Sequence, residues 1–182
     1  MSGHNKFSQI KHQKASEDGK RSKMFSILGK QISVQSRLAN GDMNSAGLRA
    51  MIEKARKANM PNDTIGRAVK KGIGSNETAL EEVLYEAFGP GGVAMMISGI
   101  TDSRNRTSNE IKNILSDHSG SLGTPGSASW AFTSARDDSG DIIYTPTTTI
   151  PLSPEDTTKL TELIEALENQ DDVKSIATNA NS

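Results

Sequence analysis

The spacing of apolar residues changes once along this 182-residue chain, near the Gly-Ile-Gly-Ser-Asn segment at residues 72–76. Before that point, apolar residues recur at every third or fourth position, which is the period of an amphipathic helix. Beyond it, apolar runs of strand length alternate with helical stretches. We therefore expect an α+β protein with a helical domain at residues 1–74 and an α/β domain at residues 75–182.

The first domain is predicted to be a small helical bundle. A long helix ends at Asn40-Gly41, which is a common stop signal because both residues tolerate a positive φ. The apolar residues of each helix fall on one side and can pack against partner helices. The four expected helices cover residues 7–14, residues 16–39, residues 46–58 and a last stretch that ends at Lys71.

The second domain is predicted to be a ferredoxin-like (βαββαβ) α/β sandwich with an extra N-terminal strand. From Val93 onward the pattern follows the split βαβ order, and two helices would cover one face of the sheet. Ser153-Pro154 is a strong helix start, with an N-cap serine and a proline at the first helical position. The expected strands cover residues 82–88, 93–100, 128–133, part of 141–152, and 173–177.

Charge divides the chain at the same place. Residues 1–74 contain fifteen Lys and Arg against five Asp and Glu, a net of +10, whereas residues 75–182 contain six against seventeen, a net of −11. The net charge of −1 for the whole chain hides this division. A strongly basic half is typical of a protein that binds a polyanion such as nucleic acid. Docking of the two halves on each other is the alternative explanation.

The N-terminal segment holds the richest set of candidate phosphate contacts. Lys23, Lys30 and Arg37 are seven residues apart, so on a helix they form a stripe about 21 Å long beside the apolar side. We expect this stripe to face solvent and to attract phosphates, although an ordinary solvated helix face fits the same pattern. The candidate nucleic-acid contacts in this segment are Lys6, Lys11, His12, Lys14, Lys20, Arg21, Lys23, Lys30 and Arg37.

Two further candidates, Arg104 and Arg106, lie in the first turn of a predicted helix, where the helix dipole disfavours cations. Two interpretations are open. The arginines could help the helix N-terminus to bind an anion such as a phosphate. Alternatively, they could pair with carboxylates of their own acidic domain.

Several other function classes have no support in the sequence. The chain has no cysteine, which excludes disulfides and thiolate chemistry, and it has no run of 18 apolar residues that could span a membrane. No two of the three histidines are spaced i, i+4, and His118 lies on an apolar stripe, so we expect no metal site. No nucleophile motif or carboxylate pair predicts catalysis. We expect a cytoplasmic, non-enzymatic protein without a cofactor or a small-molecule substrate.

A set of short motifs runs nearly from one end of the chain to the other. The motifs include Gly3-His4-Asn5-Lys6-Phe7, Lys20-Arg21-Ser22-Lys23, Asn59-Met60-Pro61, Lys70-Lys71-Gly72, Gly89-Pro90-Gly91-Gly92-Val93, Thr101-Asp102-Ser103-Arg104-Asn105-Arg106-Thr107 and Gly123-Thr124-Pro125-Gly126-Ser127. In these motifs the chain resembles the YebC family. Members of this family are typically longer, with a third α/β domain inserted into the second. Here only ten residues, 134–143, occupy that place, so the chain resembles a short variant without the inserted domain.

This resemblance implies a regulator of gene expression. The family includes probable bacterial transcriptional regulators, mitochondrial translational activators and members associated with stalled ribosomes. The resemblance adds weight to the basic N-terminal helices and to Arg104 and Arg106, and it implies no catalytic residue. We therefore expect a ribosome-associated translation factor that contacts ribosomal RNA phosphates. A DNA-binding transcriptional regulator is the alternative.

Overall fold

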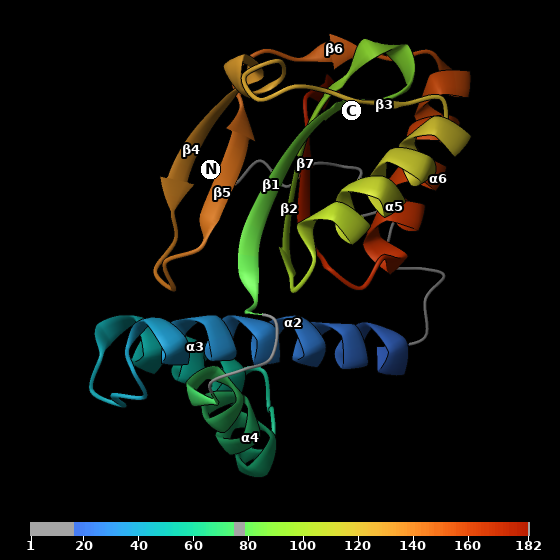
Figure 1. Ribbon diagram of the computed structural model, residues 1–182. Coiled ribbons are helices and arrows are strands. Elements are labelled where there is room, and N and C mark those ends of the chain that lie inside the picture. Colours follow the sequence, from blue (N-terminus) through green and yellow to red (C-terminus); the bar gives the residue numbers. More distant parts are fainter. Residues whose placement is uncertain (1–16, 75–78, 182) are drawn as a thin grey trace.

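The structure is a computed structural model that describes residues 17–74 and 79–181. Three helices make up the first part of this described chain. They lie close to their predicted positions, and we call them together the helical unit (Figure 1). The helix expected at residues 7–14 lies outside the described residues. The three are α2 (Glu17–Leu38), α3 (Ala46–Lys57) and α4 (Asn62–Ile73).

One apolar cluster holds the helical unit together. Its members include Ile32 of α2, Leu48 of α3 and Ile65 of α4, and burial of each such side chain contributes roughly 1.5–3 kcal/mol. The helices α2 and α4 approach so closely that a Cβ at Gly72 would lie 2.4 Å from the Ser33 carbonyl oxygen. The crossing of these two helices therefore requires the absence of a side chain at residue 72.

A four-stranded antiparallel sheet is the centre of the second part, which we call the α/β unit. Its strand order is β3-β1-β2-β7, and β1 and β2 pair along their whole length. As predicted, two helices, α5 (Arg104–Asp117) and α6 (Pro154–Asn169), cover one face of the sheet (Figure 1). The strands of this sheet are β1 (Glu81–Phe88), β2 (Ala94–Thr101), β3 (Ser121–Leu122) and β7 (Val173–Thr178).

The structure confirms the α+β class, while the sheet differs in detail from the expected ferredoxin-like arrangement. The strands β4 (Phe132–Arg136) and β5 (Ile142–Pro146) pair with each other in a separate ribbon, and β1 takes the place beside β2. A short turn joins β1 to β2, so their pairing costs little loop entropy. Of the residues in β4, only Phe132 is buried, so this strand offers little apolar surface to the main sheet. A short parallel pair joins β6 (Ile150–Pro151) to β8 (Ala180–Asn181).

Apolar side chains between the sheet and the two helices form the main core of the α/β unit. Met95 and Ile97 of β2 belong to one buried cluster with Leu115 of α5 and Leu163 of α6. Met96, which points to the other face of β2, belongs to a second cluster that includes residues of the β4–β5 ribbon. Both faces of β2 are therefore buried, as its continuous apolar sequence predicts.

Helix α2 lies between the other two helices and the end of the sheet, so it is covered on two sides (Figure 1). Its Leu28 and Ile32 pack in the core of the helical unit. Its Lys23, Lys30 and Gln31 form hydrogen bonds to the α/β unit. Among the described residues, no apolar cluster contains members from both units. Hydrogen bonds and ion pairs therefore cross this junction, on the side of α2 that also carries the buried Ile27 and Val34.

Candidate nucleic-acid interface

Two cations of the stripe predicted on α2 face the protein's own α/β unit. Lys23 Nζ donates to the Gln170 carbonyl oxygen at 3.0 Å. Lys30 Nζ lies 2.7 Å from the Asp172 carboxylate and donates to the Asp171 carbonyl oxygen at 2.9 Å. The prediction that Lys23 and Lys30 face solvent is therefore wrong. Periodicity places them on one side of a helix, but it cannot show which neighbour covers that side.

The other cations predicted in this segment have different surroundings. Arg21 and Arg37 are exposed, and the Arg21 guanidinium carbon lies 5.7 Å from the centroid of the Phe25 ring. Lys20 is half-buried. Of the predicted stripe, Arg37 therefore remains open to solvent. The candidates that lie outside the described residues are Lys6, Lys11, His12 and Lys14.

Asp172 connects the two units at one end of the junction. Its carboxylate accepts hydrogen bonds from Lys30 at 2.7 Å, from Arg106 at 2.8 Å and from the Thr107 hydroxyl at 2.7 Å. Burial alone would raise the pKa of this carboxyl. The three donors and the charge of Lys30 outweigh burial and hold the pKa of Asp172 well below its ordinary value of 3.8. The ionised Asp172 thus joins α2, α5 and the turn before β7.

Asp141, which lies at the end of the turn between β4 and β5, makes a second connection of the same kind. Its carboxylate pairs with Lys54 of α3 and accepts hydrogen bonds from Lys174 at 3.0 Å and from Gln31 of α2 at 2.6 Å. Burial acts to raise the pKa of Asp141, but these donors lower it overall. Sequence reasoning missed Asp141 and Asp172 because the residues around a carboxylate do not identify a lysine far away in the chain.

Arg104 and Arg106, at the start of α5, pair with carboxylates, which is one of the two interpretations that the sequence left open. Arg104 lies 2.7 Å from Glu81, and Arg106 lies 2.9 Å from Asp102 and 2.8 Å from Asp172. The hydrogen bond from Arg104 lowers the pKa of Glu81. The positive charges of both arginines are therefore compensated within the α/β unit.

The helices α3 and α4 carry a set of exposed cations that form no ion pair with another described residue. The apolar side of each helix lies in the core, so the polar side points to solvent. Residues 46–73 contain seven Lys and Arg but only two acids, Glu53 and Asp63. We call this set the outer cations, and they are Arg49, Arg56, Lys57, Arg67, Lys70 and Lys71.

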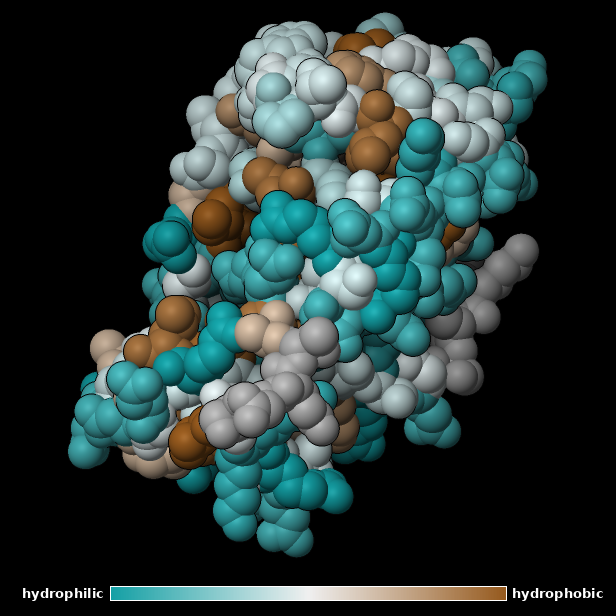
Figure 2. All heavy atoms as spheres, in the orientation of Figure 1, coloured by the Kyte–Doolittle hydropathy of each residue, from teal (hydrophilic) through white to brown (hydrophobic). Residues whose placement is uncertain are grey.

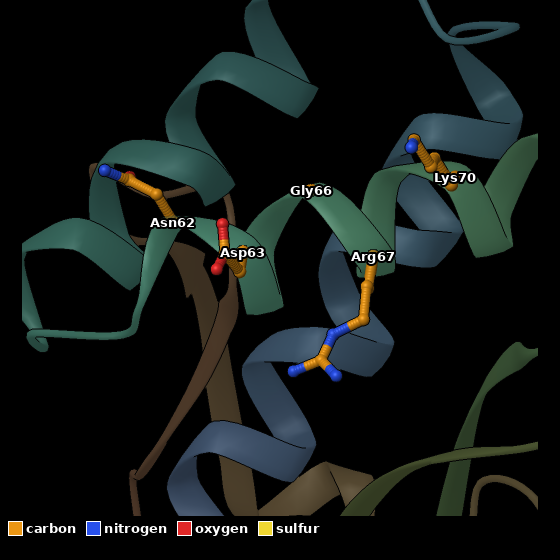
Figure 3. Close-up of a pocket in the computed structure, with 5 residues that line it drawn as sticks. All are labelled: Asn62, Asp63, Gly66, Arg67 and Lys70. Carbon is orange, nitrogen blue, oxygen red and sulfur yellow. The ribbon is translucent and has the colours of Figure 1, made fainter.

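Helix α4 presents an open part of this surface. A depression of about 510 Å³ runs along its solvent side, and a Cβ at Gly66 would meet nothing within 4 Å. Figure 3 shows the side chains of Arg67 and Lys70 projecting from the helix. The helix extends away from the α/β unit, and Figure 2 shows that this end of the molecule is hydrophilic. Such an open, cationic surface suits an extended phosphate backbone better than an enclosed small molecule.

The candidate contacts named from the sequence include none of the outer cations. The spacing of these residues along the sequence nevertheless indicates them. Arg49 and Arg56 are seven residues apart on α3, and Arg67 and Lys70 are three apart on α4. Residues at these spacings share one side of a helix, which lies beside the apolar stripe on α3 and opposite it on α4. Combining the charge count with the apolar stripes of these two helices would have identified them.

Other kinds of site have little support in the described part of the chain. Among residues 17–74 and 79–181, no three His, Asp or Glu side chains are grouped so that they could hold a metal ion. Within the same ranges, no helix combines the length and the apolar character needed to cross a bilayer. A second hollow, of about 160 Å³, is lined in part by Asp141 and Lys174 of the junction.

Family comparisons match almost the whole chain. The family model described as the TACO1/YebC protein N-terminal domain matches residues 5–75. The model described as the TACO1/YebC second and third domain matches residues 80–137 and 135–180. The chain belongs to the TACO1/YebC family.

Several TACO1/YebC relatives carry the name "probable transcriptional regulatory protein". The one from Fervidobacterium nodosum is 51% identical over 134 residues, which cover 72% of this chain and 53% of that protein. The chain thus spans about half the length of this relative. The one from Desulforamulus reducens is 35% identical over 238 residues and is matched over 98% of both proteins. These names agree with the prediction of a regulator without enzymatic activity.

A solved structure shares the fold. The crystal structure of the conserved hypothetical protein Aq1575 from Aquifex aeolicus superposes with a TM-score of 0.83 at 30% identity. The match covers 96% of each chain. The same arrangement of helices followed by sheet and helices is therefore present in another protein of known structure.

Proposed function

We propose that this protein is a regulator of gene expression that binds nucleic acid through the outer cations of α3 and α4. One observation carries this proposal: these exposed side chains form no ion pair with another described residue, whereas the cations facing the α/β unit are already paired. Exposed cations that form no ion pair with a described residue can attract a polyanion without first having to break such a pair. The two domains would then have different roles. The domain at residues 1–74 would bind nucleic acid, and the domain at residues 75–182 would position the first domain.

The names of the relatives support duplex DNA as the first candidate polyanion, because they describe probable transcriptional regulators. This reverses the order expected from the sequence. Ribosomal RNA is the second candidate, and it rests on the family resemblance to proteins that act in translation. The outer cations do not discriminate between the two, since contacts with phosphates carry no sequence information.

We also infer that the chain lacks the inserted third domain. The alignment with the Desulforamulus reducens relative spans 238 residues, whereas this chain has 182. The two matches to the second family model meet at residues 135–137, inside the β4–β5 ribbon, where a five-residue turn, Asp137–Asp141, joins the strands. Any contact that the inserted domain makes in longer members is then missing here, which leaves more of the binding to the helical unit.

Binding of a fluorescent 30-base-pair duplex, measured by anisotropy over a range of salt concentrations, tests the proposal. Loss of three phosphate contacts in an Arg67→Ala, Lys70→Ala, Lys71→Ala variant should make the log–log salt slope shallower by about 2.7. The matched control is Lys112→Ala, Arg136→Ala, Lys159→Ala, which removes three cations from the α/β unit. Equal binding by the wild type and the α4 variant would contradict the proposal.

Sedimentation with ribosomes in the same salt series separates the two polyanions. A regulator that acts on DNA should bind the duplex, with the shallower salt slope in the α4 variant, and should not sediment with ribosomes at 150 mM salt. A translation factor should show the opposite preference, and the α4 variant should lose the sedimentation. Binding to neither polyanion, even at low salt, would exclude both.

A further inference from the structure

We propose that the junction side of α2 and α3, which carries Lys23, Lys30 and Lys54, is a second phosphate-binding surface that the α/β unit covers. This inference rests on the proposed function and extends it beyond the outer cations. The carboxylates of Asp141 and Asp172 hold two of these lysines as phosphate oxygens would. A nucleic acid and the α/β unit therefore compete for the same cations.

The contacts of Lys30 are ones that a phosphate can replace. Its Nζ bonds to one carboxylate oxygen of Asp172 at 2.7 Å and to the carbonyl oxygens of Asp171 at 2.9 Å and Ile100 at 3.3 Å. All three partners are oxygen acceptors, and a phosphate offers acceptors of the same kind with a full negative charge. The contact of Lys23 with the Gln170 carbonyl is likewise one that a charged oxygen can exchange.

The spacing of these cations fits a polymer rather than a single anion. Lys23 and Lys30 are seven residues apart, which is about 10 Å along α2. Arg37 continues the line at the same spacing and is exposed. A phosphate backbone can thus reach Arg37 first and extend along α2 as the α/β unit withdraws from the lysines.

Withdrawal of the α/β unit would divide none of the apolar clusters, although Ile27 and Val34 of α2 are buried on the same side as Lys23 and Lys30. In the described chain, each apolar cluster lies within one unit. The ion pairs that join the units are still reached by water, since Lys30 is 20% exposed and Lys54 is 35% exposed. Contacts of this type weaken when a strong competing polyanion is present.

Removing the competing carboxylates provides the test. In an Asp141→Asn, Asp172→Asn variant of the full chain, Lys30 and Lys54 lose their carboxylate partners, and the duplex should bind at least about five-fold more tightly at 100 mM salt. Two or three additional phosphate contacts should steepen the log–log salt slope by about 1.8 to 2.7. The matched control is Glu162→Gln, Glu165→Gln, which removes the same charge from the exposed side of α6.

A second variant tests whether a gain in affinity comes from the released lysines or only from the two units moving apart. Lys23→Ala, Lys30→Ala, Lys54→Ala also removes the junction contacts but takes the cations away, so it should show no gain in affinity. Small-angle scattering on both variants measures whether the units move apart. If the double Asn variant does not fold, the single Asp141→Asn variant, with an expected gain of about two-fold, serves the same purpose.

Three results would overturn the inference: equal affinity for the double Asn variant and the α6 control, an equal gain in the lysine variant, or an unchanged salt slope. Each of these leaves the proposed function intact as long as the wild type binds through α4. Failure of every variant to bind the duplex would instead remove the proposed function itself. The two failures are therefore distinguishable in one set of titrations.

Discussion

Lys30 of α2 and Asp172, in the turn between α6 and β7, lie 2.7 Å apart and join the helical unit to the α/β unit. The Asp172 side chain is only 6% exposed and keeps Arg106 and Thr107 as further donors. A hydrogen bond to a charged group in such surroundings contributes about 1.5–3 kcal/mol.

Replacement of Lys30 by alanine should lower the free energy of unfolding by about 1–3 kcal/mol, because Asp172 loses a charged partner while Arg106, Thr107 and Gln170 remain as donors. Urea unfolding followed by circular dichroism measures the loss. Lys112→Ala on the exposed side of α5 should change stability by no more than about 0.5 kcal/mol. A Lys30→Ala variant as stable as the Lys112→Ala variant would show that the pair contributes nothing.

Stability should fall on acidification in a way that depends on Asp172. Because its folded-state pKa is below the ordinary value of 3.8, its contribution is complete above that value and is lost as the pH falls toward the folded-state pKa. Between pH 5 and pH 2, one such group steepens the decline by at most about 1.4 kcal/mol per pH unit. Urea unfolding at several pH values should give a shallower acid limb for Asp172→Asn than for the wild type, whereas Glu162→Gln should follow the wild type. Parallel acid limbs for all three proteins would refute this.

Replacement by alanine should have opposite effects on stability at two glycines of α4. A Cβ at Gly72 would press on the Ser33 carbonyl oxygen, so Gly72→Ala should destabilise the protein by about 1–3 kcal/mol. At Gly66 a Cβ meets nothing within 4 Å, so Gly66→Ala should stabilise the helix by up to about 1 kcal/mol. Melting temperatures of the two variants provide the comparison. A stabilising effect at residue 72 would mean that α2 and α4 are less close than described.

The Glu86 carboxylate should control the order of the loop before β4. It accepts backbone hydrogen bonds from Gly126 at 2.7 Å, Ala128 at 2.7 Å and Ser129 at 2.9 Å, and these bonds lower the pKa of Glu86 overall although burial acts to raise it. In a Glu86→Ala variant these three amides should exchange hydrogen at least about ten-fold faster, which NMR measures residue by residue. Glu82→Ala, an exposed change on the same strand, should leave their exchange unchanged. Unaltered protection in the Glu86→Ala variant would disprove the role of this carboxylate.

Local patterns in the sequence predicted much of the fold. The stop of α2 at Asn40-Gly41 is confirmed by positive φ angles at both residues. Ser153 accepts the expected capping hydrogen bond from the Asp156 amide at 3.1 Å, since this bond depends only on neighbouring residues. The β4–β5 ribbon, which lies apart from the main sheet instead of joining it as a ferredoxin-like order requires, shows the limit of such patterns. Strand order depends on competition between distant partners, which no local spacing records.

The candidate site was harder to predict for the same reason. The sequence showed that Lys23 and Lys30 share one side of a helix, yet it could not show that Gln170 and Asp172 cover that side. Net charge located the basic half of the chain correctly, but counting charges does not separate paired cations from open ones. Paired and open cations can be told apart only when both the polar side of each helix and the residues that neighbour it are known.

The most direct test of the central claim is a map of the residues that contact nucleic acid. The full chain would be photo-crosslinked to labelled duplex DNA, and separately to ribosomes, and the crosslinked peptides identified by mass spectrometry. Our account predicts crosslinks on α3 and α4, at peptides that contain Lys57, Lys70 and Lys71, and few at Lys112 or Lys159 of the α/β unit. Crosslinks confined to the α/β unit, or none on α3 and α4 with either polyanion, would contradict it.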